Sequence, residues 1–251
     1  MLLNKSRAYE IMDKYRLDAL LAVTPRNIYY LTDFSGFNNR TQRSFYEYAL
    51  FPRKEDAPAA YITTAVELPR LNDFPSWVPN IQTYTHPISL SNRDYDTHTE
   101  DPEAGMPINW PIRKHRNLPE REKQWLELKK KFGEKISASP LLALKKAIQD
   151  ASLEKATIGT DDPRVILWLK EVGLEFIDSV EATNIFREIR MIKSPDEIKL
   201  LTKAAEINEK GMQAAINSVN EGVKWVDIQS SFFNEISKLG GQAVYITAGP
   251  G

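Results

Sequence analysis

Short apolar runs alternate with segments of helical periodicity through residues 1–185. Ala19–Val23 is a continuous apolar run, which is typical of a strand covered on both faces. Just before it, Ala8, Ile11 and Met12 recur at helical spacing. Similar patterns predict strands at 48–51, 59–62, 81–84, 157–160 and 174–177, and helices at 65–71, 141–148 and 162–168. This alternation predicts an α/β fold with a mixed, substantially parallel sheet.

Residues 86–118 interrupt the alternation. They contain few periodic apolar positions, many scattered charges, and the prolines Pro87, Pro102, Pro107 and Pro111. This composition indicates a long excursion over the surface.

The final third of the chain follows a helical pattern. Ser194 and Pro195 predict a helix start, because serine caps the first turn and proline suits its first position. Glu197 lies three residues after the serine, as in a capping box. We expect a first helix of about 24 residues, a second amphipathic helix from Trp225 to Leu239, and a strand at Ala243–Thr247.

Two helices and a strand do not make a domain by themselves, because each amphipathic face needs another layer to pack against. Leaving one large apolar side chain exposed forgoes roughly 1.5–3 kcal/mol. We therefore divide the chain into a complete domain at 1–185 and an incomplete one at 186–251. The missing layer either follows in a longer parent chain or comes from another chain.

The composition excludes several classes of function. The chain has no cysteine, so disulfides, thiolate nucleophiles and cysteine-ligated metals are absent. Its 33 basic and 34 acidic side chains give a net charge of −1, which provides no long-range attraction to nucleic acid or anionic lipid. Neither a signal peptide nor an apolar run of about 18–20 residues is present, so we expect a cytoplasmic protein without membrane contact.

Catalytic and metal-binding motifs are missing as well. The histidines are His86, His98 and His115, and none lies at a metal-ligand spacing from another. Acidic residues surround His98, but such a cluster is more often a solvated loop than a metal site. The basic run Arg113–Arg116 is followed by interleaved glutamates, which favour a solvated helical face over a phosphate site. We predict no catalytic residue and no metal ligand in this chain.

Four segments carry a resemblance to a known family. Arg187–Leu201, with its Ile-Lys-Ser-Pro-Asp-Glu-Ile core, resembles the junction between the two domains of the creatinase/prolidase/Xaa-Pro aminopeptidase family. Glu221–Val223 resembles the turn into the second helix of that family's catalytic domain. Ala243–Gly251 resembles the strand that follows there and its glycine-containing turn. Asn27–Phe34 resembles the Asn-Ile-x-Tyr-Leu-Thr-Gly-Phe pattern of its N-terminal domain, with Asp33 in the usual glycine position.

The resemblance implies a creatinase-type N-terminal domain followed by the first two helices and a strand of a pita-bread α+β domain. Such enzymes are mostly metallohydrolases that cleave Xaa-Pro peptides or related small substrates, and we expect this chain to form a homodimer. They use two divalent metals, commonly Mn, Co or Zn, held by two Asp, one His and two Glu. All five ligands would lie beyond Gly251. The chain alone is therefore expected to be inactive. The alternatives are a non-catalytic dimerisation or interaction protein, or a parent from another branch, such as a sulfonium-propionate lyase.

The resemblance also suggests substrate-binding residues. In dimeric relatives, the loop after the Asn-Ile-x-Tyr motif reaches the partner's active site. Here that loop carries Phe34, Phe37, Arg40 and Arg43. An aromatic ring and an arginine can hold the apolar part and the carboxylate of a substrate. Packing and solvated charge are the alternative interpretation of these four residues.

Overall fold

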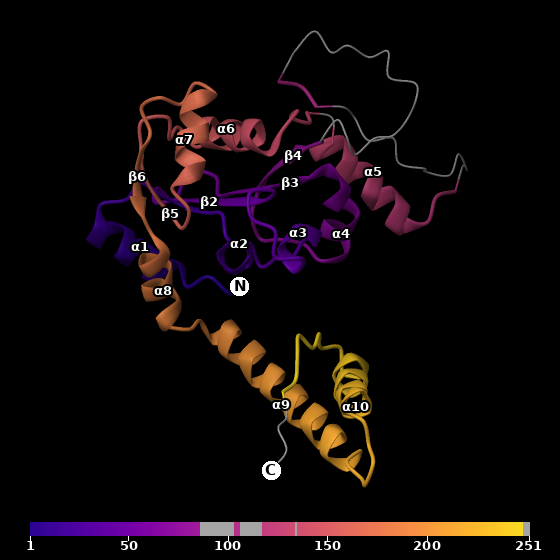
Figure 1. Cartoon of the computed structure of the whole chain (residues 1–251). Helices are drawn as coiled ribbons and strands as arrows, with labels where there is room; N and C mark the ends of the chain where they lie inside the picture. The colour runs from indigo at the N-terminus through magenta and orange to yellow at the C-terminus, as the bar shows by residue number, and fades with distance from the viewer. Residues whose placement is uncertain (86–102, 106–116, 134, 248–251) are drawn as a thin grey trace. The chain divides into compact units, whose positions relative to one another are not determined.

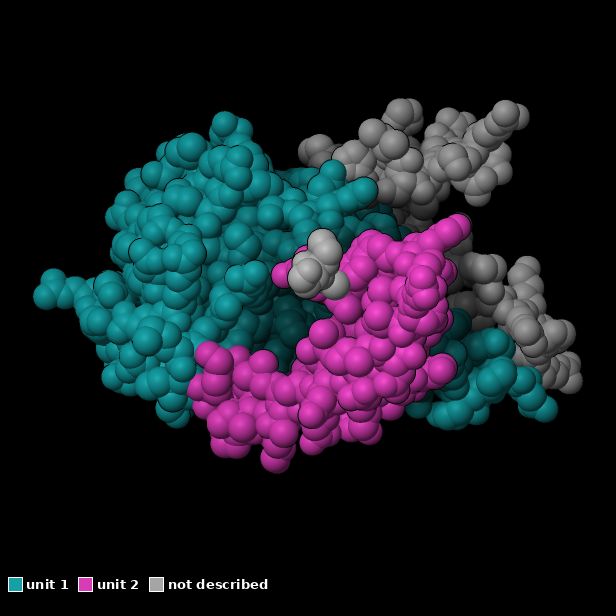
Figure 2. Space-filling model, turned by 60° about the horizontal axis from the view of Figure 1, so that its bottom comes forward, with its two compact units in different colours: residues 1–192 teal, residues 193–251 magenta. Residues whose placement is uncertain are grey.

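The computed structural model describes residues 1–85, 103–105, 117–133 and 135–247. Two compact units divide the chain, residues 1–192 and 193–251 (Figure 2). Most of the predicted surface excursion at 86–118 lies outside the described residues. No helix in the described ranges is both long and apolar enough to cross a membrane.

Six strands form one sheet in the described part of the first unit (Figure 1). They are β1 (Ala19–Ala22), β2 (Tyr48–Pro52), β3 (Ala60–Thr64), β4 (Asn80–Tyr84), β5 (Thr157–Thr160) and β6 (Asp178–Glu181). Their order in the sheet is β4-β3-β2-β1-β5-β6. The pairs β3–β4, β1–β5 and β5–β6 are parallel, whereas β1–β2 and β2–β3 are antiparallel. The predicted α/β fold with a mixed, substantially parallel sheet is thus confirmed.

Helices cover both faces of this sheet (Figure 1). They are α1 (Lys5–Tyr15), α2 (Pro25–Thr32), α3 (Phe37–Arg40), the short 3-10 helix η1 (Ala65–Glu67), α4 (Leu68–Asp73), α5 (Glu120–Phe132), α6 (Pro140–Asp150), α7 (Arg164–Glu171) and α8 (Thr183–Met191). Strand β1 lies at the centre, and all four of its residues are buried. Leu20 and Ala22 join one apolar cluster with α1, α2 and α8, whereas Ala19 and Leu21 join another with α6 and α7. The continuous apolar run in the sequence therefore reflects burial on both faces.

Helix starts lie where the local sequence predicts them. The Ser139 hydroxyl accepts the Leu142 N–H at 3.2 Å at the start of α6. Pro25 occupies the first turn of α2. In the second unit, the Ser194 hydroxyl accepts the Glu197 N–H at 3.1 Å. These capping contacts satisfy N–H groups that have no partner within the helix.

Two predicted strands are wrong. Residues 174–177 form a turn, and the strand follows at Asp178–Glu181. Leu174 and Ile177 are apolar because they pack into the core from that turn. Residues 243–247 adopt no strand either, since no strand is described in the second unit for them to pair with. A strand needs hydrogen bonds from a neighbour, which sequence periodicity does not reveal.

The first unit extends through α8, beyond residue 185 where the sequence analysis places the domain boundary. Ile185, Phe186 and Ile189 are buried in the cluster that also contains α1. The Glu188 carboxylate accepts bonds from the Lys14 ammonium at 2.8 Å and the Tyr15 hydroxyl at 3.0 Å. Both its apolar face and its polar contacts thus attach α8 to the first unit.

Asp161 joins the end of β5 to the start of α2. Its Oδ1 accepts the Val23 N–H at 2.7 Å, and its Oδ2 accepts the Thr24 N–H at 3.1 Å and the Asn27 side-chain amide at 2.7 Å. The side-chain oxygen Oδ1 of Asn27 in turn accepts a bond from the Arg190 guanidinium of α8 at 3.0 Å. The asparagine of the Asn-Ile-x-Tyr motif therefore connects three elements of the first unit.

Replacing Asp161 with alanine should lower the free energy of unfolding by about 2–4 kcal/mol, because two backbone N–H groups and the Asn27 amide lose a charged acceptor. Urea unfolding followed by circular dichroism measures the loss. The matched control is Asp56→Ala at an exposed position, for which we expect a change below about 0.5 kcal/mol. Equal unfolding free energies for the two variants would contradict this role of Asp161.

The second unit consists of two long helices, α9 (Pro195–Asn217) and α10 (Trp225–Lys238). They pack closely at Gly211, where an added Cβ would lie 2.7 Å from Ile236 Cγ1. Only a small apolar cluster forms between them. Many large apolar side chains of this unit are instead exposed, among them Ile198, Leu200, Leu201, Ile216, Val219 and Val226.

Candidate functional site

The segment between α2 and β2, residues 36–46, is here called the α3 loop. It begins with α3, and its start is fixed because the Glu67 carboxylate accepts the Phe37 N–H at 2.8 Å. The Asn39 side chain donates to the Pro25 carbonyl oxygen. The Arg43 N–H then closes the turn on the Asn38 carbonyl oxygen at 2.9 Å.

The second half of the α3 loop is held in a conformation that side chains rarely adopt. Gln42 and Phe45 have φ angles of 56° and 69°. The Phe45 ring packs edge-on against Trp168, with 4.9 Å between the ring centroids. The Phe45 carbonyl oxygen accepts the Tyr48 hydroxyl at 3.1 Å. Such backbone strain persists only where the surroundings enforce it, and it is more frequent at functional sites.

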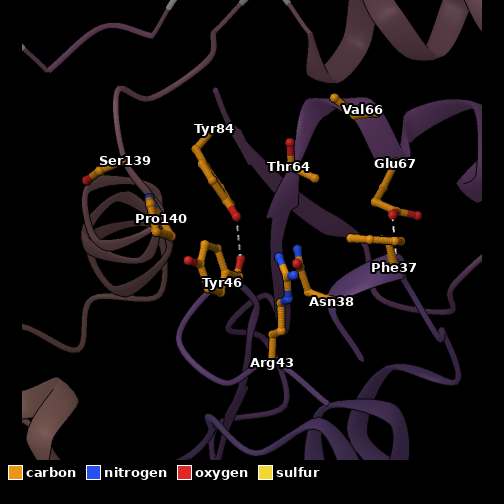
Figure 3. Close-up of a pocket in the computed structure, with 10 residues that line it drawn as sticks. All are labelled: Phe37, Asn38, Arg43, Tyr46, Thr64, Val66, Glu67, Tyr84, Ser139 and Pro140. Carbon is orange, nitrogen blue, oxygen red and sulfur yellow. Dashed lines mark hydrogen bonds between the residues drawn. The ribbon is translucent and has the colours of Figure 1, made fainter. Parts of the chain in front are cut away.

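A cavity of about 550 Å³ lies beside the α3 loop (Figure 3). Its lining comprises Phe37, Asn38, Arg43, Tyr46, Thr64, Val66, Glu67, Tyr84, Ser139 and Pro140. The Arg43 guanidinium lies 5.9 Å from the centre of the Phe37 ring. On the opposite side, the Tyr84 hydroxyl donates to the Tyr46 carbonyl oxygen at 2.7 Å.

The cavity combines apolar surface with a guanidinium and a carboxyl group. Phe37, Tyr46 and Val66 are exposed apolar side chains on its wall. Arg43 supplies a planar cation that can bind a carboxylate through two hydrogen bonds. The Glu67 carboxyl group is buried and is engaged by the Phe37 N–H. The arrangement suits a small ligand with an apolar part and an anionic group.

The four predicted substrate-binding residues lie in different environments. Phe34 is only 1% exposed and packs against Tyr61 in the core, so its ring does not line the cavity. Phe37 is 57% exposed and lines the cavity together with Arg43. Arg40 is exposed on the same loop but is not part of the cavity wall. The structure therefore brings Phe37 and Arg43 together and separates Phe34 from them.

The sequence analysis missed the carboxyl groups beneath the loop. Glu47 is 1% exposed, and its Oε1 accepts the Thr63 hydroxyl at 3.1 Å. Burial, and after it the nearby Glu67 carboxylate, raise the pKa of Glu47 to about 7. A Cβ at Gly36 would lie 2.4 Å from Glu47 Oε1, so this position suits glycine. The only signal in the sequence is a lone glutamate directly before the apolar strand Tyr48–Pro52.

The described residues do not fit a two-metal centre. Among them there is no group of three or more His, Asp or Glu side chains that could hold a metal ion. His86, His98, His115 and the basic run 113–116 lie outside the described residues.

Comparison with known proteins finds similarity at the level of the fold. No protein-family profile and no curated protein matches the chain. Among solved structures, it is similar to a prolidase from Pyrococcus horikoshii OT3, with 18% identity, a TM-score of 0.52, and coverage of 93% of this chain and 48% of that one. An X-Pro aminopeptidase from Thermotoga maritima MSB8 matches with 12% identity, a TM-score of 0.57, and coverage of 94% and 49%.

A prolidase from Thermococcus sibiricus matches with 17% identity, a TM-score of 0.56, and coverage of 94% of this chain and 50% of that one. The chain spans about half the length of these solved structures. Both units contribute to the match, because residues 1–192 alone are too few to supply the coverage. The chain thus has a fold found in about half of a prolidase or X-Pro aminopeptidase chain.

Proposed function

We propose that this chain is the first half of a Xaa-Pro peptidase-like metallohydrolase. The observation that carries the proposal is the match of nearly the whole chain, across both units, to prolidases and an X-Pro aminopeptidase. The family resemblance of Arg187–Leu201 at the border between the units supports it. In this proposal the first unit binds substrate and mediates assembly, and the metal-binding half follows in the longer protein.

The exposed apolar side chains of α9 and α10 support the same proposal. Each forgoes roughly 1.5–3 kcal/mol while it faces water. A curved sheet from the remainder of a pita-bread domain would cover them. That sheet would also carry the two Asp, one His and two Glu that hold two divalent metals, Mn, Co or Zn, which activate water and stabilise the developing oxyanion.

The proposal predicts that the 251-residue chain binds no pair of divalent ions and does not hydrolyse Xaa-Pro dipeptides. Calorimetric titration with Mn²⁺, Co²⁺ and Zn²⁺, together with a proline-release assay, tests this directly. Two-ion binding with turnover would show that the chain carries its own metal centre. The complementary test is the coding sequence after codon 251, where the five ligands are expected.

Within the longer protein, we propose that Phe37 and Arg43 contact the substrate of the partner protomer in a homodimer. This proposal is supported by the fixed conformation of the α3 loop, which places an exposed aromatic ring and a guanidinium in the wall of one cavity. Arg40 is exposed on the same loop and stays a candidate. Phe34 supports the loop from the core.

Replacing Arg43 with alanine in the longer protein should raise KM about tenfold or more, because a bidentate bond to the substrate carboxylate is lost. Metal content should stay unchanged, since no ligand is touched. Arg26→Ala, at an exposed position on α2, is the matched control and should leave KM unaltered. Unchanged KM values in both Arg40→Ala and Arg43→Ala would end this part of the proposal.

An interaction protein without catalysis is the second candidate, and the apolar surface of α9 and α10 favours it. A native stop codon after Gly251 and a stable dimer of the 251-residue chain would support this candidate over the first. Should the longer protein carry the five ligands but leave Xaa-Pro peptides intact, an assay with a sulfonium propionate would identify the lyase branch.

A further inference from the structure

Two buried carboxyl groups lie directly beneath the start of the α3 loop. The Glu67 carboxylate holds the Phe37 N–H at 2.8 Å, which positions the first residue of α3. The Glu47 carboxyl group is buried next to Gly36, close enough that a Cβ there would lie 2.4 Å from its Oε1. Both groups therefore contact the same turn of backbone from below.

Within the described residues, neither carboxyl group pairs with a cation. No salt bridge joins Glu47 or Glu67 to a basic side chain among the described residues. The Arg43 guanidinium packs over the Phe37 ring, and Arg70 of α4 donates to the Ser35 carbonyl oxygen at 3.1 Å. Arg40 lies on the loop itself.

The remaining titratable neighbours keep their protons. Burial raises the pKa of Tyr61 and that of Tyr84, so both hydroxyl groups stay neutral across the physiological range. Glu47 Oε1 accepts the Thr63 hydroxyl, and Oε2 is buried with no hydrogen-bond donor among the described residues. The Thr63 and Tyr61 hydroxyls and the Asn39 backbone N–H lower the pKa of Glu47, but burial and the Glu67 carboxylate outweigh them. A charge on Glu47 would thus be buried, poorly solvated and close to the Glu67 carboxylate.

We propose that Glu47 and Glu67 act as a proton-dependent clamp on the α3 loop, holding it in place while Glu47 is protonated and loosening it when Glu47 ionises. While Glu47 is protonated, Glu67 Oε1 accepts the Phe37 N–H without a charged neighbour. Ionisation of Glu47 places two like charges in one buried site. Movement of the loop relieves this repulsion by admitting water. The loop movement itself does not depend on the proposed function. Its consequence does rest on the proposed function: substrate contacts of Phe37 and Arg43 weaken as the pH rises.

The test follows backbone amides of the ¹⁵N-labelled 251-residue chain by nuclear magnetic resonance between pH 5 and 9. We expect the Phe37 and Arg43 amides to shift together with a midpoint near pH 7. In Glu47→Gln that transition should vanish, because an amide mimics the protonated acid. The Val23 amide, which is bound to the Asp161 carboxylate instead, should show no such transition and serves as the internal control.

Two further measurements separate the clamp from other causes. A variant with His86, His98 and His115 all changed to glutamine should retain the transition, because the clamp assigns it to Glu47. Should Glu47→Gln fail to fold, the side-chain ¹³C shift of Glu47 in the unaltered chain reports its ionisation directly. A midpoint near 4.5, or a transition that persists in Glu47→Gln, would overturn the clamp. These readouts need neither metal nor substrate, so a failed peptidase assay leaves them valid, and a failed titration leaves the proposed function standing.

Discussion

A chain that ends at Ile185 should fail to fold, whereas one that ends at Ile192 should unfold cooperatively. The shorter chain loses Phe186 and Ile189, which are both fully buried against α1 and its neighbours. Removing such side chains typically costs about 3–5 kcal/mol for phenylalanine and about 2–5 kcal/mol for isoleucine. Their sum approaches the whole stability of an ordinary domain, about 5–15 kcal/mol.

Polar contacts add to this loss. Without α8, the Lys14 ammonium and the Tyr15 hydroxyl lose the Glu188 carboxylate, and Asn27 loses its bond from Arg190. Far-ultraviolet circular dichroism and urea unfolding of the two truncated chains provide the measurement. Phe186→Ala in the 251-residue chain keeps the length constant and should lower the unfolding free energy by about 3–5 kcal/mol. Matching urea midpoints for the two truncated chains would place the end of the first domain at residue 185, as the sequence predicts.

Local signals account for what the sequence predicts well. The caps at Ser139 and Ser194 depend on residues three positions apart, and both form as expected. The run Ala19–Val23 is apolar throughout because helices cover both faces of β1. A buried stretch and its helix caps can therefore be read without knowledge of distant residues.

Long-range pairing explains what the sequence does not predict. Asp161 binds Asn27 across 134 positions, and Glu47 and Glu67 meet only because β2 and β3 fold back on each other. Long-range pairing also explains why the strand predicted at 174–177 is wrong. The observed strand β6 is a largely exposed edge strand, and its position is set by backbone pairing with β5. Apolar periodicity reports burial, and burial without a pairing partner does not make a strand.

The candidate site combines both kinds of information. Phe37 and Arg43 follow the Asn-Ile-x-Tyr motif, so their loop could be selected from the sequence alone. Phe34 lies just before this loop and packs into the core, and only the backbone path distinguishes it from Phe37. The other side of the cavity comes from Thr64, Tyr84 and Ser139, which no local pattern connects to the loop.

Between pH 5 and pH 8, the unaltered chain should lose roughly 2–3 kcal/mol of unfolding free energy that the Glu47→Gln variant keeps. Because the folded-state pKa of Glu47 is about 7 and the ordinary value is 4.5, folding favours the protonated acid. That contribution is fully present below pH 4.5, falls as the pH rises, and is lost above pH 7. The full shift corresponds to roughly 3 kcal/mol, since one pKa unit is about 1.4 kcal/mol.

The comparison with Glu47→Gln isolates this one group, because all other titrations are common to both chains and cancel. Urea unfolding at pH 5, 6, 7 and 8 measures the difference at each step. Thr63→Val is the matched control for the lost hydroxyl bond: it removes the donor to Glu47 Oε1 but keeps the carboxyl group. It should therefore retain the pH dependence, and it should shift the midpoint upward because the hydroxyl bond favours the charged form. If the difference between the Glu47→Gln chain and the unaltered chain is the same at all four pH values, Glu47 does not titrate in this range, and the carboxyl pair beneath the α3 loop has a purely structural role.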